Sequence, residues 1–245
     1  MGNSIVVIPD YHAHPDYDNE RASVIGEFIA ARRPDLVVCL GDFADMPSIC
    51  EHSSKLSLEG ARYKEDIAAS KDAMQKLLAP IKRRKKGTPK LVMCLGNHED
   101  RIPRLISQDP RMTDVVSLLD LDYERAGWHV VPFKVPIELC GWLFCHYFPS
   151  GVLGRAISGA NVAKSMVNKL HHSAIQGHSH LAGHHIETSG TGARLHGISA
   201  GCVSHPDHIE GWNLNTHKQW WRGILVLDNA SLGDASVSFV RLEDL

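Results

Sequence analysis

Carboxylate, amide and imidazole side chains follow five separate apolar segments of this 245-residue sequence. Such side chains supply the oxygen and nitrogen atoms that bind borderline divalent metal ions without any thiolate. Asp-x-His and His-x-His pairs suit a single metal ion, because alternate residues of an extended chain point the same way. The pattern predicts a metal centre formed by side chains from residues 10–12, 42–45, 97–100, 146 and 178–180.

Two metal ions bridged by a carboxylate such as Asp42 would suit the hydrolysis of a phosphate ester. In two-metal hydrolases the ions lie about 3.5–4 Å apart, lower the pKa of a bound water and neutralise charge on the phosphoryl oxygens. We therefore expect a metal-bridging hydroxide to attack phosphorus.

Strands alternate with helices in the first half of the chain. Apolar runs rich in β-branched residues at positions 4–9, 36–40 and 91–95 predict buried strands. Apolar residues recur at helical spacing between these runs, first over residues 24–29 and then over residues 67–81. This order predicts a parallel sheet with right-handed crossovers, in which the carboxyl ends of the strands meet at one edge. The donor side chains follow those ends, so the sheet would bring them together.

The second half of the chain predicts a second sheet. Strands are expected at residues 128–139, 142–146, 173–176, 184–188, 193–198, 220–227 and 236–242, and a helix at 161–170. Residues 46–63 have weak periodicity and predict a long loop or short helices over the site. With no clear linker, residues 1–245 are expected to form one domain.

Composition narrows the class of protein. Hydrophobic residues at 43% and charged residues at 22% are typical of a globular protein. No apolar run is long enough to span a membrane, and the N-terminal sequence resembles a first strand more than a signal peptide, so we expect a cytoplasmic protein. A net charge of −2 gives no global attraction to nucleic acid. None of the six cysteines forms a C-x-x-C pair, whereas sixteen histidines favour a metal site.

The motifs resemble those of the calcineurin-like metallophosphoesterase family. They lie in the family's order and read Asp10-Tyr11-His12, Gly41-Asp42-Phe43-Ala44-Asp45, Gly96-Asn97-His98-Glu99, His146 and Gly177-His178-Ser179-His180. Each motif alone is a weak signal, but five in order after predicted strands are specific. The resemblance implies an α/β fold, in which a β-sandwich of two mixed sheets is flanked by helices in four layers.

The resemblance also implies roles for individual residues. One metal ion would be bound by Asp10, His12, Asp42 and His180, and the second by Asp42, Asn97, His146 and His178, with Asp42 bridging. Asn97 and His98 would contact the phosphate, and His98 would protonate the leaving oxygen as a general acid. Asp45 would orient a histidine ligand or His98. Mn²⁺ is the expected metal, with Fe, Zn²⁺, Co²⁺ and Ni²⁺ as alternatives.

The sequence departs from the family pattern in two places. Met46-Pro47 follows Asp45 where the protein Ser/Thr phosphatases of the family have an arginine-glycine pair, which disfavours a phosphoprotein substrate. Tyr147 follows His146 where relatives often have glycine. Four other histidines therefore compete for that ligand position, namely His171, His172, His184 and His185.

Several further residues are candidate substrate contacts. Arg101 is preferred over Arg104 as a partner of a substrate phosphate. His205 and His208 are candidates to line the pocket, and Trp212, Trp220 and Trp221 to stack on a base, although core packing is the commoner role of tryptophan. The basic run at residues 82–86 predicts a solvated helix end. The histidines expected at the surface or in the core are His14, His52, His129, His196 and His217.

These observations favour a phosphodiesterase or nuclease acting on DNA, RNA or a nucleotide. A phosphomonoesterase for small molecules or nucleotides is the alternative. A binding scaffold that has kept the fold and lost turnover is disfavoured, because His98 and every ligand position are filled. The sequence leaves the oligomeric state open.

Overall fold

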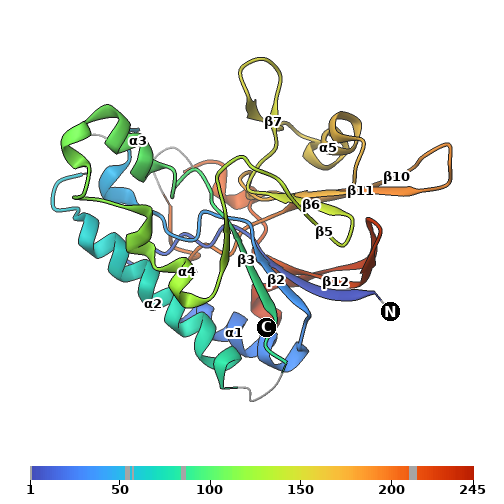
Figure 1. Cartoon of the computed structure of the whole chain (residues 1–245), viewed down its shortest axis with the longest axis horizontal. Coiled ribbons are helices and arrows are strands. Elements are labelled where there is room, and N and C mark those ends of the chain that lie inside the picture. Colours follow the sequence, from blue (N-terminus) through green and yellow to red (C-terminus); the bar gives the residue numbers. More distant parts are fainter. Residues whose placement is uncertain (1, 53–55, 57, 84–86, 210–213) are drawn as a thin grey trace.

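The computed structural model describes residues 2–52, 56, 58–83, 87–209 and 214–245 (Figure 1). Two sheets pack face to face, with helices on the outer face of each (Figure 1). The helices are α1 (Glu20–Arg32), α2 (Tyr63–Lys82), α3 (Arg101–Gln108), α4 (Tyr123–Ala126) and α5 (Val162–Leu170). The predicted α/β sandwich of two mixed sheets is therefore confirmed.

The first sheet has the strand order β13-β12-β1-β2-β3-β4. Its strands are β1 (Asn3–Ile8), β2 (Leu36–Cys39), β3 (Lys90–Cys94), β4 (His129–Val131), β12 (Gly223–Ser231) and β13 (Asp234–Arg241). Strands β1 to β4 are parallel, and β12 joins β1 in the antiparallel sense. The predicted parallel core of this sheet is present, with an antiparallel pair added beside β1.

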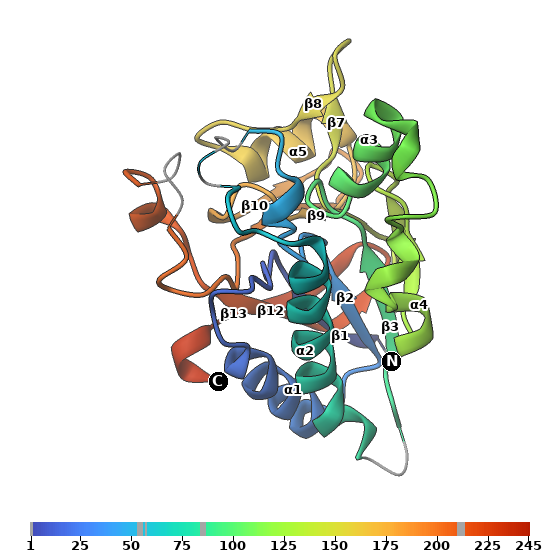
Figure 2. The same ribbon diagram turned by 90° about the vertical axis from the view of Figure 1, so that its left-hand side faces the viewer.

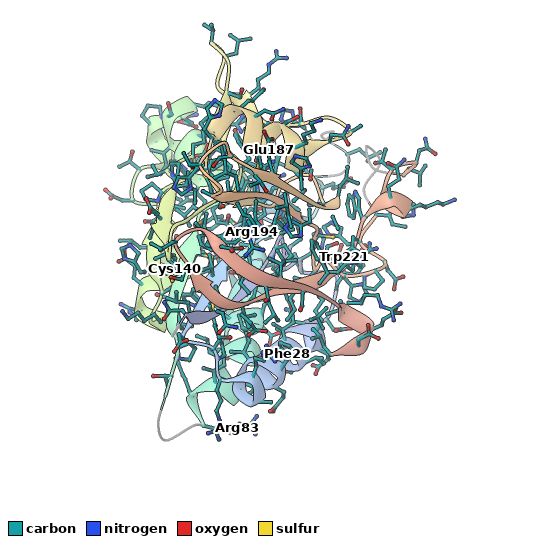
Figure 3. The ribbon with its side chains drawn as sticks, turned by 90° about the vertical axis from the view of Figure 1, so that its right-hand side faces the viewer. Phe28, Arg83, Cys140, Glu187, Arg194 and Trp221 are labelled. Carbon is teal, nitrogen blue, oxygen red and sulfur yellow. The ribbon has the colours of Figure 1, made fainter. Side chains whose placement is uncertain are left out.

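The second sheet has the order β10-β11-β9-β6-β5. Its strands are β5 (Ile137–Leu139), β6 (Trp142–Cys145), β9 (Ala174–Gln176), β10 (Ala182–Thr188) and β11 (Arg194–Ala200). Strands β6, β9 and β11 are parallel, and the two edge strands are antiparallel to their neighbours. A small hairpin, β7 (Pro149–Ser150) and β8 (Arg155–Ala156), follows β6. Arg194 of β11 lies at one side of the molecule (Figure 3). Its guanidinium forms an ion pair with Asp234 of β13, which links the two sheets.

Three layers of apolar side chains hold these elements together. Val6 and Ile8 of β1 face the core between the first sheet and α1 and α2, which lie side by side across that sheet (Figure 2). Ile5 and Val7 point the opposite way, into the core between the sheets. Met166 of α5 contributes to a third core, on the outer face of the second sheet. Because both faces of β1 are covered from Ile5 to Ile8, these four residues are all apolar and do not alternate with polar ones.

The sequence-based strand at residues 128–139 is wrong as a single element. The structure divides it into β4 and β5, which belong to different sheets. Pro132 and Pro136 lie between them, and proline lacks the N–H that a continuous ladder requires. A turn closed by the Val135 N–H and the Pro132 carbonyl carries the chain from one sheet to the other.

Residues 46–63 begin with a short 3-10 helix at Pro47–Ile49, as expected of a segment with short helices, although residues 53–55 and 57 lie outside the described part. Helix α3 was not predicted. Its apolar residues Ile102, Leu105 and Ile106 have helical spacing, with Pro103 in the first turn where proline is tolerated. Among the described residues no helix has the length and apolar character needed to cross a membrane.

Asp66 of α2 holds this segment in place. Its carboxylate accepts hydrogen bonds from the backbone N–H and the hydroxyl of Ser48. Burial outweighs these bonds and raises the pKa of Asp66 from its ordinary value of 3.8 to about 6. Because the unfolded chain ionises first, the free energy of unfolding falls as pH rises through this window, by up to about 3 kcal/mol.

We expect Asp66→Asn to remove this pH-dependent fall in the free energy of unfolding. The thermal midpoint of the variant should then fall less than that of the wild type between about pH 4 and about pH 7. Thermal denaturation followed by circular dichroism measures both. An identical change of midpoint in the two proteins would show that Asp66 ionises in the folded state at its ordinary pKa.

Candidate metal centre

The predicted donor side chains meet at one edge of the sandwich. Asp10, Asp42 and Asn97 follow β1, β2 and β3 of the first sheet. His146 follows β6, and His178 and His180 follow β9, in the second sheet. The carboxyl ends of parallel strands from both sheets therefore converge, and the structure brings all seven predicted donor residues into two adjacent groups.

The first group consists of Asp10, His12 and His180, whose donor atoms all lie within 4.8 Å of one another. The Nε2 atom of His180 lies 3.1 Å from Asp10 Oδ2 and 3.1 Å from His12 Nε2. His12 Nδ1 donates to Asp45 Oδ1 at 2.6 Å, so in the neutral ring the Nε2 atom keeps its lone pair. All three side chains are buried, and their donor atoms face one another.

The second group consists of Asp42, His146 and His178. The Nε2 atom of His146 lies 3.2 Å from His178 Nδ1, 3.3 Å from Asp42 Oδ2 and 2.8 Å from Asn97 Oδ1. His146 Nδ1 donates to the Leu40 carbonyl oxygen at 2.9 Å, which fixes the ring and directs Nε2 to the group. Asn97 thus joins this group through its amide oxygen.

The four histidines that competed with His146 lie elsewhere. His171 caps the end of α5, and His172 Nδ1 contacts the backbone oxygen of Ser173. His184 Nε2 lies 3.0 Å from His196 Nδ1 on the paired strand, and His185 lies near Glu187. Within the described part of the chain His146, and not these four, belongs to the donor groups.

The charges of the two groups suit cation binding. Burial works against ionisation, but His146 and His98 hold the pKa of the Asp42 carboxyl well below its usual range. Burial, followed by His98, lowers the pKa of His12 to about 4, and burial with His146 does the same for His178. Ionised carboxylates and neutral imidazoles are the forms that bind metals. For His146, burial lowers the pKa but Asp42 raises it to about 9, so cation binding there must displace a proton.

Two glycines make room for the carboxylates. A Cβ atom on Gly96 would lie 2.1 Å from Asp42 Oδ1, and one on Gly177 would lie 2.0 Å from Asp10 Oδ1. This Asp10 oxygen is buried and has no hydrogen-bond partner among the described atoms, although the other accepts the His178 N–H at 2.7 Å. An ionised oxygen buried in this way needs a cation, so the donor set fits a metal ion.

Four candidate ligands have left-handed backbone. The φ angles are 53° at His12, 48° at Asp42, 65° at His178 and 57° at His180. Non-glycine residues rarely adopt this conformation, and each instance costs about 1–3 kcal/mol. Such strain gathers at functional sites, where surrounding contacts impose it.

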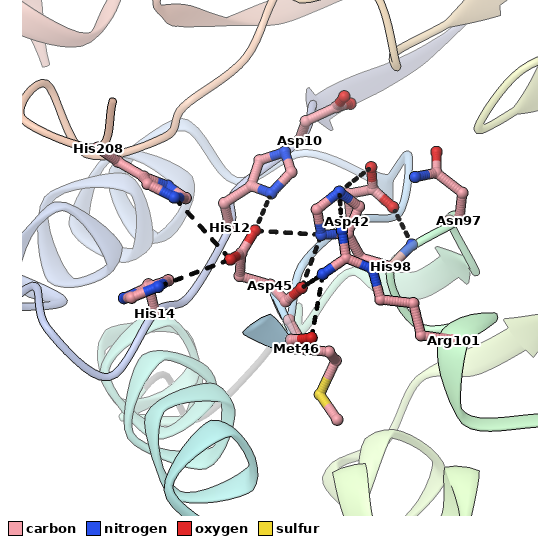
Figure 4. Close-up of polar contacts among 12 residues, drawn as sticks. Asp10, His12, His14, Asp42, Asp45, Met46, Asn97, His98, Arg101 and His208 are labelled. Carbon is pink, nitrogen blue, oxygen red and sulfur yellow. Dashed lines mark hydrogen bonds and ion pairs between the residues drawn. The ribbon is translucent and has the colours of Figure 1, made fainter. Parts of the chain in front are cut away.

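His98 lies beside the two groups, in contact with Asp42 and Asp45. Its Nδ1 donates to the Asp45 backbone oxygen at 2.6 Å, and its Nε2 lies 3.8 Å from Asp42 Oδ2. Burial lowers the pKa of His98, but the Asp42 and Asp45 carboxylates outweigh it and raise the pKa to about 9. Asp45 Oδ1 contacts both His12 Nδ1 and His98 Nδ1, so the structure gives it both of the partners considered for it (Figure 4).

Arg101 is held close to His98 by the backbone. Its NH1 donates to the carbonyl oxygens of Asp45 and Met46, and its NH2 lies 3.3 Å from His98 Nε2 (Figure 4). Arg104 instead forms an ion pair with Glu51, the ordinary surface role.

The other candidate substrate contacts have different neighbours. Trp220 packs edge-on against His180 with ring centroids 4.2 Å apart, whereas Trp221 packs on Phe239. His205 stacks on Tyr17. Trp212 and residues 84–86 of the basic run lie outside the described residues, and Lys82 ends α2.

Glu99 was not predicted to have a role, although it stands in the third motif. Its buried carboxylate accepts the backbone N–H groups of Asp42, Phe43, Ala44 and Gly96 at 2.8–3.0 Å. A carboxylate that pairs with consecutive N–H groups fixes the loop and with it the direction of the Asp42 side chain. The signal that could have revealed this role is a charged residue directly after His98.

We expect Glu99→Gln to destabilise the fold. The amide presents hydrogen atoms to buried N–H donors, and unsatisfied buried donors cost about 1–3 kcal/mol each, so a loss of about 2–4 kcal/mol is expected. Urea denaturation measures this loss. Glu124→Gln, at an exposed position of α4, is the matched control and should change little. A stability equal to that of the control would contradict the role given to Glu99.

Comparison with known proteins agrees with this architecture. The Gene 54 protein of Mycobacterium phage L5 is 30% identical over 198 residues, covering 78% of this chain and 74% of that protein. The Gene 54 protein of Mycobacterium phage D29 is 31% identical over 200 residues, with the same coverage. The calcineurin-like phosphoesterase family matches residues 4–182, which include every candidate ligand. The chain therefore belongs to the calcineurin-like phosphoesterase family.

Proposed function

We propose that the chain hydrolyses phosphodiesters of nucleic acid or of nucleotides, with two divalent metal ions as cofactors. The family hydrolyses phosphate esters at a binuclear metal site, and the buried aspartate and histidine groups fit such a site. The observation that carries the proposal is the pair of adjacent donor groups at the shared edge of the two sheets. Residues 1–245 act as one domain in this proposal, since both sheets supply ligands.

We assign each proposed ligand to one metal ion according to the group of donor atoms in which it lies. Asp10, His12 and His180 would hold one ion, Asn97, His146 and His178 would hold the other, and Asp42 would contribute to both. Asp42 suits a position between the two ions. Its carboxylate lies within 4.8 Å of donor atoms of His146 and His178, and also within 4.8 Å of donor atoms of His12 and His98. When bound, the ions supply an activated water and neutralise charge on phosphate. Mn²⁺ fits the mixture of oxygen and nitrogen donors, which includes none of the described cysteines.

His98 is the proposed general acid. Its Nδ1–H is engaged by the Asp45 backbone oxygen, which directs the Nε2 atom toward the donor groups. An imidazolium at this place can give its Nε2 proton to the departing alcohol oxygen. Asn97 and His98 then contact the phosphate, and the Arg101 guanidinium, whose NH2 lies 3.3 Å from His98 Nε2, repels the imidazolium and favours release of its proton.

The charges near His98 favour a diester over a monoester. A phosphate monoester carries about −1.5 to −2 charges near neutral pH, whereas a diester carries one. Arg101 directs NH1 to two backbone oxygens, and Arg104 is paired with Glu51, so these cations have partners within the protein. A substrate with one negative charge needs fewer positively charged side chains to bind it than a dianion does.

Hydrolysis of bis-p-nitrophenyl phosphate and p-nitrophenyl phosphate with added Mn²⁺ tests this proposal. We expect kcat/KM for the diester to exceed that for the monoester by at least about tenfold, which corresponds to about 1.4 kcal/mol. Faster turnover of the monoester would instead establish the second candidate, a phosphomonoesterase. DNA, RNA and cyclic nucleotides are the next substrates, and a cytoplasmic location remains a prediction from the sequence.

A further inference from the structure

A third cluster of metal-binding side chains lies on the far side of Asp45. His14 Nε2 and His208 Nε2 each lie 3.9 Å from Asp45 Oδ2. The donor atoms of these three residues all lie within 4.8 Å of one another. Figure 4 shows His14 and His208 on one side of the carboxylate and His12 and His98 on the other. The sequence alone indicates no function for His14 and makes His208 only a candidate to line the pocket.

The two oxygens of Asp45 have different neighbours. Oδ1 lies 2.6 Å from His12 Nδ1 and 3.1 Å from His98 Nδ1. Oδ2 faces His14 and His208 instead, at distances longer than a hydrogen bond. One carboxylate can therefore serve the candidate binuclear centre with one oxygen and a separate cation with the other.

The chain segments that carry these donors are fixed by hydrogen bonds. Asp45 N–H donates to the Ala13 carbonyl oxygen at 3.1 Å, which joins the Asp45 loop to the His14 segment. The Tyr17 hydroxyl donates to the Asp207 carbonyl oxygen at 3.1 Å, and Arg21 Nε donates to the Val203 carbonyl oxygen at 2.9 Å. Donors held in place before a cation arrives lose little conformational entropy on binding.

We propose that His14, Asp45 and His208 bind a third divalent cation of the Zn²⁺ class, separate from the two ions of the binuclear centre. Two imidazoles and one carboxylate are a known zinc ligand set, and they leave a fourth position for water. In a tetrahedral Zn²⁺ site with bonds of about 2.0–2.2 Å the donors lie roughly 3.3–3.5 Å apart. The observed 3.9 Å spacing needs an inward movement of only a few tenths of an ångström.

Access and burial also fit a cation site. Asp45 and His208 are buried, whereas the His14 side chain is 15% exposed and opens the cluster to solvent. The rings of His14 and His208 lie 4.9 Å apart at an angle of 48°, so both nitrogens can face the carboxylate. A cation here would hold Asp45 from the side opposite to His12 and His98. Its occupancy would then influence the orientation of both of these histidines.

Metal stoichiometry tests this inference. We would strip the full chain with a chelator, add excess Zn²⁺, remove unbound metal by dialysis and measure bound zinc by mass spectrometry. We expect about three equivalents in the wild type and about two in His14→Gln and in His208→Gln. His205→Gln changes a histidine of the same loop that stacks on Tyr17, outside the three donors, and should keep all three equivalents.

Two equivalents in the wild type, or three in both donor variants, would overturn the proposal. His14→Gln keeps the test valid if the more buried His208 variant fails to fold, which circular dichroism detects. Failure of the binuclear centre has a different signature, because Asp42→Asn would lose zinc while the third equivalent remained. The visible spectrum of the Co²⁺-substituted chain gives an independent reading, since loss of the third ion should remove part of the absorbance.

Discussion

Asp42→Asn is expected to lower kcat for hydrolysis of bis-p-nitrophenyl phosphate by at least about 10³-fold, equivalent to about 4 kcal/mol. Asp42 is the residue whose donor atoms group both with His146 and with His12. The amide removes the negative charge that would bridge two cations. Asparagine keeps the shape of the side chain. Its amide oxygen can still accept the hydrogen bond that the backbone N–H of His98 donates to Asp42 Oδ1 at 2.9 Å. The loss should therefore come from metal binding and not from misfolding.

Metal analysis and thermal denaturation separate these causes. The variant should bind less Mn²⁺ than the wild type and should retain a cooperative unfolding transition. Asp114→Asn is the matched control, because Asp114 is exposed and its left-handed backbone tolerates asparagine. Full activity in Asp42→Asn with its metal content unchanged would remove Asp42 from the proposed centre.

His98→Gln is expected to give a loss that depends on the leaving group. General acid catalysis contributes about 10²–10⁴-fold when the departing alkoxide is basic. p-Nitrophenolate leaves readily without a proton, so its diester should lose less than about tenfold beyond any change in binding. A methyl or phenyl ester should show the larger loss. Because His98 is not one of the proposed ligands, metal content should stay the same.

A series of diesters with leaving groups of increasing pKa measures this difference. The dependence of kcat on leaving-group pKa should be steeper in the variant than in the wild type. His129→Gln, at an exposed position of β4, is the control for loss of an imidazole. Equal losses across the series would indicate that His98 binds the phosphate and does not donate a proton.

Much of the candidate centre could be predicted from local sequence. Each of Asp10, Asp42 and Asn97 directly follows an apolar run, and parallel strands must bring such ends together. The histidine after β6 was harder to assign because its neighbours depart from the family pattern. The structure places it by a long-range contact, the hydrogen bond from His146 to the Leu40 carbonyl oxygen, which sequence spacing does not reveal.

Other features depend on contacts between distant segments. The sequence does not show that the two oxygens of Asp45 have different neighbours. The contacts of Asp45 with His14 and His208 join segments that are distant in the sequence. The pairing of β12 with β1 likewise joins the two ends of the chain. Pro132 and Pro136 could have signalled the division of residues 128–139, because proline lacks the N–H that a continuous strand ladder requires. Local sequence propensity predicts a strand poorly where pairing with distant segments determines whether that strand forms.

The origin of the candidate ligands in two different sheets has a consequence for how the protein unfolds. Separating the sheets would separate Asp10 and His12 from His180, even if each sheet kept its own hydrogen-bonded ladder. Ions that bind only the docked sheets stabilise that docking by mass action, by about 4 kcal/mol at a free concentration 1,000-fold above Kd. Metal supply would therefore set not only turnover but also the cooperativity with which the two halves of the sandwich come apart.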